Sequence, residues 1–242
     1  FGVIDEKYSA KALERWLLYY FKDIKLSQLL KPCLITAYDI ERRRAHFFRQ
    51  HDAKIAGDAN DFFIRDVCRA TAAAPTYFQA VDVRALNNER YPLIDGGVYM
   101  NNPALGAYSE VRSALEKPIA KDMFIVSLGT GDVSKPYPFQ EAKNYGALKW
   151  ARPLIDIMMS GAAEVTHFHL TKMYDAVGRQ DQYKRIQPDD MADVNPAMDA
   201  ASSANIRALV ALGIDTAQKA DAMLEEVAEI VINDAKEELL FV

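Results

Sequence analysis

Apolar residues recur along this chain at two different spacings, and each spacing predicts one kind of element. Leu13, Trp16, Leu17 and Tyr20 follow one another at intervals of three, one and three, so we expect an amphipathic helix from Ser9 to Phe21 with these side chains on one face. Helices that alternate with few, buried strands indicate the α/β class. Further helices are expected over residues 62–74, 102–115, 147–177, 203–212 and 216–240, and strands over residues 33–39, 45–49, 91–94, 123–128 and 183–187.

Three small residues precede Pro75, which is expected to end the helix over residues 62–74. Ala72, Ala73 and Ala74 reduce the steric bulk at that helix end, so another backbone can approach it closely. Ordinary helix propensity explains three alanines equally well.

Asp95 is the most informative chemical group, because it ends an apolar run and precedes Gly96 and Gly97. A carboxylate at a strand end can present its oxygens to a cleft, since glycines supply unusual backbone angles and remove side chains that would block access. Asp95 is therefore a candidate base. Alternatively, Asp-Gly-Gly forms only a tight turn, and the Asp95 oxygens then accept hydrogen bonds from the backbone of Gly97 or Val98.

Composition fits one large globular domain over residues 1–242 and excludes some functions. Half of the 242 residues are hydrophobic, which allows a substantial core. The net charge of −5 argues against a nucleic-acid partner, because phosphate binding requires clustered Lys and Arg. No apolar stretch of ~18 residues is present, so we expect a soluble chain, cytoplasmic or peripheral to a membrane. Cys33 and Cys68 lie in apolar contexts and are expected to be buried free thiols.

Neither a metal nor a cofactor is expected from the motifs. His167 and His169 are two residues apart on a predicted helix and point in different directions, and His46 and His51 have no partner at metal-binding spacing. The segment Gly129-Thr130-Gly131 could cradle a phosphate after its strand, but the third glycine of the dinucleotide fingerprint and the P-loop lysine are absent. A nucleotide-binding domain is therefore the least favoured function.

Several motifs in a fixed order resemble the patatin-like phospholipase family. The segment from Asp61 to Phe78 ends in A-A-A-P-T-Y-F, Asp95-Gly96-Gly97 is followed by N-N-P, and a later strand ends in S-L-G-T-G. The likeness continues through residues 147–150, 183–187 and 198–202, so it covers most of the chain. Several motifs at compatible spacing are far more specific than any one of them.

The resemblance implies a lipid acyl hydrolase with a Ser-Asp dyad, in which Asp95 is the general base. It also implies a three-layer α/β/α fold with a mostly parallel central sheet, of which residues 1–242 form the C-terminal part of a single domain. The G-x-S-x-G elbow that holds the family's nucleophilic serine does not occur in residues 1–242. Phe1 is not methionine, so we expect that serine and the oxyanion glycines in a missing N-terminal segment of the same protein. The chain alone should then be inactive and have an apolar open face.

The same resemblance implies what surrounds Asp95 and what it acts on. The substrate is expected to be a phospholipid or another acyl lipid, reached through a transient contact with a membrane surface. The loop Lys135–Phe139 is a candidate lip for that contact, and an ordinary loop folded on the protein explains it as well. The alternative to a hydrolase is a non-catalytic or regulatory patatin-like module. Residues expected to shape the site are Ala74, Pro75, Gly96, Gly97, Gly129 and Gly131.

Overall fold

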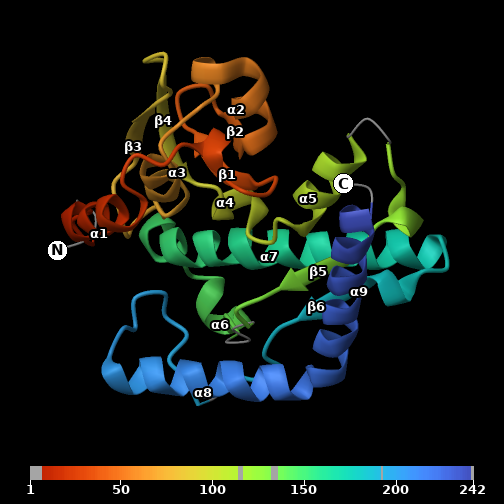
Figure 1. Ribbon diagram of the computed structural model, residues 1–242. Helices are drawn as coiled ribbons and strands as arrows, with labels where there is room; N and C mark the ends of the chain where they lie inside the picture. The colour runs from red at the N-terminus through yellow and green to blue at the C-terminus, as the bar shows by residue number, and fades with distance from the viewer. Residues whose placement is uncertain (1–6, 114–116, 132–135, 192, 241–242) are drawn as a thin grey trace. The chain divides into compact units, whose positions relative to one another are not determined.

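The computed structural model describes residues 7–113, 117–131, 136–191 and 193–240, and these fall into two compact units. Unit 1 comprises Phe1–Pro118 and Gly146–His169, and unit 2 comprises Ile119–Tyr145 and Leu170–Val242. Figure 1 shows the elements along the chain. The long helix α7, Ala147–Ala176, contributes residues to both units and matches the helix predicted there. The single domain expected over residues 1–242 stays a prediction.

Unit 1 contains a four-stranded antiparallel sheet. Its strands are β1 (Leu34–Asp39), β2 (Arg44–Arg49), β3 (Val81–Arg84) and β4 (Arg90–Asp95), in the order β2-β1-β4-β3. Ile35 of β1 lies opposite Phe48 of β2, and Tyr38 of β1 lies opposite Ile94 of β4. The strands predicted over residues 33–39 and 45–49 are confirmed as β1 and β2, and they form a hairpin that turns through Arg43, whose φ is 50°.

Helices cover this sheet and enclose an apolar core. Helix α3 packs against β1, β3 and β4, and the core places Phe48, Phe62, Val67 and Leu93 almost fully out of solvent. The helices of unit 1 besides α7 are α1 (Lys11–Phe21), α2 (Gln50–Ala56), α3 (Ile64–Thr71), α4 (Gly97–Met100) and α5 (Ala104–Arg112), with short 3₁₀ turns η1 (Leu26–Gln28) and η2 (Gly57–Ala59).

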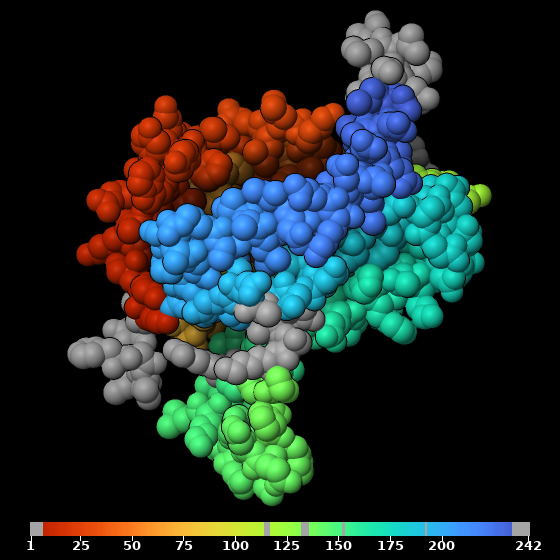
Figure 2. Space-filling model, turned by 90° about the horizontal axis from the view of Figure 1, so that it is seen from below, coloured from red at the N-terminus to blue at the C-terminus, as the bar shows by residue number. Residues whose placement is uncertain are grey.

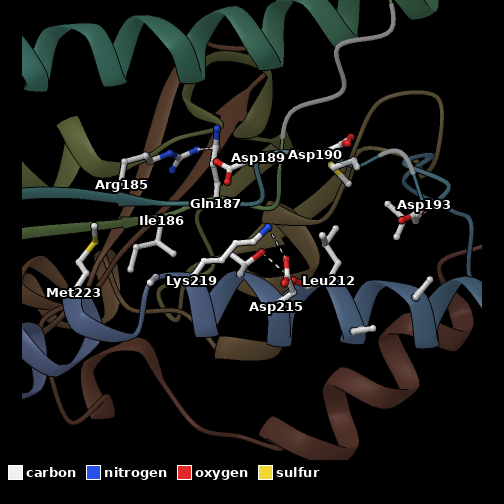
Figure 3. Close-up of a pocket in the computed structure, with 16 residues that line it drawn as sticks. Arg185, Ile186, Gln187, Asp189, Asp190, Asp193, Leu212, Asp215, Lys219 and Met223 are labelled. Carbon is white, nitrogen blue, oxygen red and sulfur yellow. Dashed lines mark hydrogen bonds and ion pairs between the residues drawn. The ribbon is translucent and has the colours of Figure 1, made fainter.

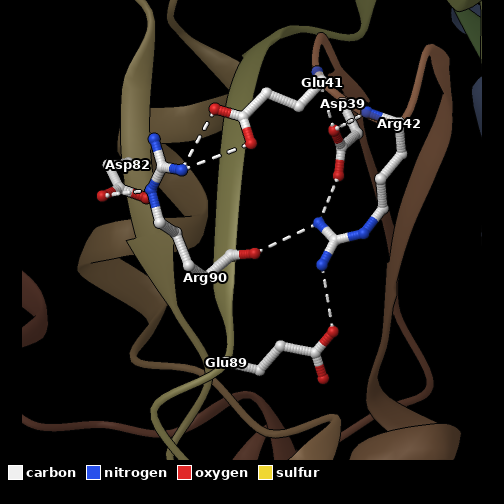
Figure 4. A network of polar contacts seen from close by, with 6 residues as sticks. All are labelled: Asp39, Glu41, Arg42, Asp82, Glu89 and Arg90. Carbon is white, nitrogen blue, oxygen red and sulfur yellow. Dashed lines mark hydrogen bonds and ion pairs between the residues drawn. The ribbon is translucent and has the colours of Figure 1, made fainter.

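A polar network closes the hairpin end of the sheet (Figure 4). Asp39 is 1% exposed and accepts hydrogen bonds from the backbone N–H groups of Glu41 and Arg42 and from the Arg42 guanidinium. Arg42 also donates to the carbonyl of Arg90 and pairs with Glu89 at 3.1 Å. The first arginine of the basic run Arg42-Arg43-Arg44 therefore anchors this turn, because a buried carboxylate requires such partners.

Unit 2 is built around a parallel pair of strands. β5 (Ile125–Leu128) pairs with β6 (Tyr183–Ile186), and the Tyr174 hydroxyl of α7 donates to the Met123 carbonyl at 3.1 Å beneath them. Figure 2 shows the outer surface of α8 and α9 in blue. The remaining elements of unit 2 are α6 (Phe139–Ala142), α8 (Ser203–Lys219), α9 (Asp221–Leu240) and the 3₁₀ turns η3 (Ala120–Asp122) and η4 (Gln180–Gln182).

The α/β class is confirmed, but the strand directions differ from the expected mostly parallel sheet. Within the described ranges only β5 and β6 pair in parallel, and the larger sheet is antiparallel throughout. Apolar runs identify strands without their direction, which depends on the connections between them. The helix expected to end at Leu212 instead continues through Gly213 to Lys219.

Large apolar side chains are exposed in both units. Leu128 at the end of β5 is 72% exposed, and unit 1 exposes Leu154, Ile157 and Phe168 along α7. Single exposed apolar side chains are common in folded proteins, and Met123 of the same segment is buried, so the apolar open face expected for an incomplete sheet stays a prediction. In the described ranges, no helix combines the length and apolar character needed to cross a bilayer.

Candidate active site

Asp95 is the last residue of β4, and its backbone is held from two sides. It lies opposite Ala37 of β1, and its N–H donates to the carbonyl of Ala73 at 3.1 Å. The side chain of Thr71 donates to the Thr36 carbonyl at 2.8 Å, which ties the end of α3 to β1. The position of the carboxylate is therefore fixed by the sheet and by the segment that follows α3.

The Asp95 carboxylate is half-buried, and its two oxygens have different surroundings. Oδ1 accepts a hydrogen bond from the Gly97 N–H at 2.7 Å, whereas Oδ2 makes no hydrogen bond to any described residue. Burial raises the pKa of this carboxyl above its ordinary value, and the Gly97 hydrogen bond opposes that change. The bond to Gly97 is the one that the tight-turn alternative predicts, and the side chain is half-buried. Asp95 thus combines a fixed oxygen with an unbonded one.

Gly96 is required by a close contact with β1. A Cβ at this position would lie 2.3 Å from Thr36 Oγ1 and 2.5 Å from the Thr36 backbone carbon, so any side chain collides. The φ of Gly96 is −71°, which other residues adopt readily, so the unusual backbone angle expected from the sequence is wrong here. A Cβ on Gly97 would lie 3.1 Å from Asp95 Oδ1 and 3.2 Å from the Met159 methyl, both tight contacts. The glycines therefore make room for neighbours.

The alanines before Pro75 lie beside Asp95. Helix α3 ends at Thr71, three residues earlier than predicted, and Ala73 is fully buried where its carbonyl accepts the Asp95 N–H. Ala74 is 8% exposed, and its carbonyl accepts hydrogen bonds from the N–H groups of Tyr77 and Phe78. Small side chains thus allow the close backbone approach that was one of two explanations for them.

Gly129 and Gly131 lie in unit 2, and the side chains nearest to them, Arg185 and Met191, line a cavity of that unit. A Cβ on Gly129 would lie 2.4 Å from the Arg185 guanidinium, and one on Gly131 would lie 2.3 Å from the Met191 sulfur. Gly131 also has a φ of +99°, which favours glycine. Their expected contribution to the Asp95 site stays a prediction, since they are in the other unit.

The cavity of unit 2 has a volume of about 710 Å³ and a mixed lining. Arg185 donates to Ser127 Oγ at 2.8 Å, and Lys219 pairs with Asp215 at 2.8 Å, so both cations are engaged with side chains of their own unit (Figure 3). Several aspartates contribute to its wall, yet no group of three or more His, Cys, Asp or Glu in the described ranges could hold a metal ion.

A second, smaller cavity of about 400 Å³ lies in unit 1 and is mainly apolar. Leu34 and Phe47 from β1 and β2 face Met100 and Leu105, which follow the Asp95 loop in the sequence. A Cβ on Gly106 would lie 2.9 Å from the Met100 sulfur, so the absence of a side chain at Gly106 leaves room for Met100. The chain therefore offers apolar volume in the unit that holds Asp95.

Sequence reasoning found Asp95 and its glycines but missed the residues that fix them. Thr36 lies in a predicted strand, and its alternation of side chains gave no sign that its backbone would contact Gly96. Met159 comes from α7, more than sixty residues later, and only a three-dimensional contact identifies it.

Comparisons with known proteins identify a family and several relatives with similar sequences. Residues 2–108, which include the Asp95 loop, match the family model for patatin-like phospholipase. The chain is 29% identical to patatin-like protein 1 of Arabidopsis thaliana, with 94% of this chain and 62% of that protein covered. It is 30% identical to patatin-like protein 2 of the same plant, with 88% and 57% covered. It is 28% identical to a Solanum tuberosum protein named "Probable inactive patatin-3-Kuras 1", with 90% and 63% covered.

The chain belongs to the patatin-like phospholipase family, a family of lipid acyl hydrolases. It spans less than two thirds of the length of each of these relatives.

Proposed function

We propose that this chain takes part in hydrolysis of lipid acyl esters and that Asp95 is the base of a Ser-Asp dyad. The observation that carries this proposal is the half-buried Asp95 carboxylate, with Oδ1 bonded to the Gly97 N–H and Oδ2 without a partner in the described ranges. The serine has no G-x-S-x-G counterpart in residues 1–242, so we assign it to a segment outside them.

In this mechanism Asp95 moves one proton in each half-reaction. As the serine oxygen attacks the ester carbonyl, Asp95 Oδ2 accepts its proton, and the protonated carboxyl then gives that proton to the departing alcohol. Asp95 next removes a proton from water, which attacks the acyl-serine ester. The protonated carboxyl gives that proton to the departing serine oxygen, so the fatty acid is released and the serine hydroxyl is restored.

The structure supports Asp95 in that role in two ways. The Gly97 N–H holds Oδ1, so one carboxylate orientation is fixed before the substrate arrives. Burial raises the pKa of the carboxyl, and a base with a raised pKa accepts a proton from an alcohol more readily. An ordinary exposed aspartate would be a weaker base.

The test measures fatty-acid release from phospholipid vesicles by two proteins, the 242-residue chain and the product of its whole coding sequence. We expect no release above background from the chain and clear release from a product that also carries G-x-S-x-G. Release by the 242-residue chain alone would place the nucleophile within it and contradict the proposal.

A non-catalytic patatin-like module is the second candidate. It is favoured by the missing serine elbow and by the potato relative whose name calls it inactive. In that case the whole coding product carries no G-x-S-x-G and releases no fatty acid.

A further inference from the structure

Helix α1 exposes three aromatic rings that contact one another. Trp16, Tyr19 and Tyr20 are 58%, 67% and 66% exposed, although the sequence predicts Trp16 and Tyr20 on the apolar face. The Trp16 ring stacks on Tyr20 with centroids 5.9 Å apart, and Tyr19 meets Tyr20 edge-on at 5.2 Å. Phe21, near the end of the helix, instead packs against the core of unit 1. The aromatic cluster is thus a surface feature and contributes little to the core.

Positive charge lies beside these rings. Lys11 and Arg15 are four residues apart and share a side of α1, Lys22 follows its last residue, and all three are exposed. Within the described ranges none of the three forms an ion pair. We call Trp16, Tyr19, Tyr20, Lys11, Arg15 and Lys22 together the α1 patch.

The acidic residues of the same segment are neutralised by α3. Glu14 pairs with Arg69 Nε at 3.2 Å, and Asp23 pairs with Arg65 Nη1 at 2.5 Å. Glu14 of α1 and Asp23, two residues after that helix, are therefore both paired with arginines of α3. The α1 patch keeps its positive charge on a chain whose net charge is −5.

We propose that the α1 patch docks on the surface of an anionic phospholipid membrane. Trp and Tyr rings are favoured at the membrane–water interface, where an apolar ring and a polar edge are both accommodated. Lys and Arg beside them bind anionic head groups, while their alkyl stems remain along the apolar surface. This inference deepens the proposed function, because a lipid hydrolase must reach its substrate at an interface.

Charge also argues against a second copy of the chain as the occupant. In a symmetric dimer formed through this surface, the patch would face itself and place Lys11 and Arg15 near their own copies. Like charges in contact oppose such a pairing, whereas an anionic lipid surface complements them. The loop that the sequence offers as a lip exposes two rings, Tyr137 at 37% and Phe139 at 74%, and Lys143 lies over the Phe139 ring. Lys135 lies outside the described residues.

The first experiment measures flotation of the 242-residue chain with vesicles of phosphatidylcholine, with and without phosphatidylglycerol. We expect binding to the anionic vesicles, weakened by added salt, and little binding to phosphatidylcholine alone. The double variant Trp16→Ser, Tyr20→Ser should lose about 10-fold or more in binding, and the control Phe139→Ser should bind like the parent. All these side chains are exposed, so circular dichroism should show unchanged folding.

Two double variants, each of which removes two positive charges, separate binding by the α1 patch from a general electrostatic attraction of the chain to anionic vesicles. Lys11→Gln with Arg15→Gln should lower binding to anionic vesicles by about 30-fold, the loss expected for two cations at such a surface. Lys54→Gln with Lys121→Gln removes the same charge elsewhere and should have little effect.

Tryptophan fluorescence reports the contact directly. The sequence has two tryptophans, so Trp150→Phe leaves Trp16 as the single emitter. Its emission should shift to the blue and be quenched by brominated lipid when anionic vesicles are added. Equal binding of the Trp16→Ser, Tyr20→Ser variant, no binding of the parent, or a dimer that this variant dissociates would overturn the proposal. No turnover is measured, so failure here leaves the hydrolase proposal standing.

Discussion

Protonation of His46 should make unit 1 lose stability at acid pH. The imidazole lies in a cage of rings, with centroid distances of 4.5 Å to Phe48, 4.9 Å to Tyr91 and 6.0 Å to Phe62. Its Nε2 is buried without a hydrogen-bond partner in the described ranges. Burial, which disfavours the charged imidazolium, lowers the pKa of His46 to about 4.

Four charged groups act on His46 besides burial. Asp39 and Glu89 favour its protonation, whereas Arg44 and Arg42 oppose it. These contributions oppose one another, so burial decides the direction of the pKa change. The ring remains neutral in the folded protein at pH 7.

The size of the effect follows from the two pKa values. A decrease from 6.5 in the unfolded chain to about 4 in the folded one is worth about 3 kcal/mol at about 1.4 kcal/mol per pH unit. The folded pKa is the lower one, so this stability is fully present above pH 6.5. It falls as the pH decreases from 6.5 to about 4 and changes no further below that.

Urea unfolding followed by circular dichroism from pH 7.5 to 4 tests this prediction. Burial also raises the pKa values of Asp66 and Asp95, so the pH dependence of the parent protein alone does not isolate His46. The variant His46→Phe keeps those groups and a ring in the cage, so the difference between parent and variant isolates His46. That difference should grow by about 3 kcal/mol in favour of the variant as the pH falls. Parallel curves for the two proteins would refute the reasoning.

Two further pairs of variants test how unit 1 is held together. Gly96→Ala should lower the free energy of unfolding by about 3 kcal/mol or more, because its methyl group would collide with the Thr36 backbone. Gly97→Ala should lower it by about 1 kcal/mol, and urea midpoints that rank the two variants in reverse would contradict the geometry. Asp61→Ala should lower the free energy of unfolding by about 3 kcal/mol, since this buried carboxylate accepts hydrogen bonds from the N–H and the hydroxyl of Ser27. Ser27→Ala removes only the hydroxyl and should lower it by about 1 kcal/mol, so equal losses from the two variants would contradict this ranking.

Local patterns predicted the elements well where the pattern was long. The helix α7 and the hairpin of β1 and β2 follow from periodicity in windows of the sequence itself. The antiparallel arrangement of β1 and β4 does not, because strand direction depends on fifty intervening residues and on where the chain returns.

The sequence predicted which residues form the candidate site but not the contacts that require them. A carboxylate before two glycines identifies Asp95, yet the reason for Gly96 is a contact with Thr36, which is distant in sequence. The exposure of Trp16 and Tyr20 was also not predictable. The apolar periodicity of a helix counts an aromatic ring as apolar and does not distinguish a ring buried in a core from one exposed at the surface.

The most direct test of the account replaces Asp95 by Asn in the coding product that carries the serine elbow. This change keeps the size of the side chain and removes the base, so fatty-acid release should fall by about 10²- to 10⁴-fold while the unfolding midpoint moves little. Asp58→Asn makes the same chemical change at an exposed position of unit 1 and should release fatty acid at the parent rate. If Asp95→Asn is folded and also hydrolyses phospholipid at the parent rate, Asp95 is a turn residue and the dyad assignment is wrong.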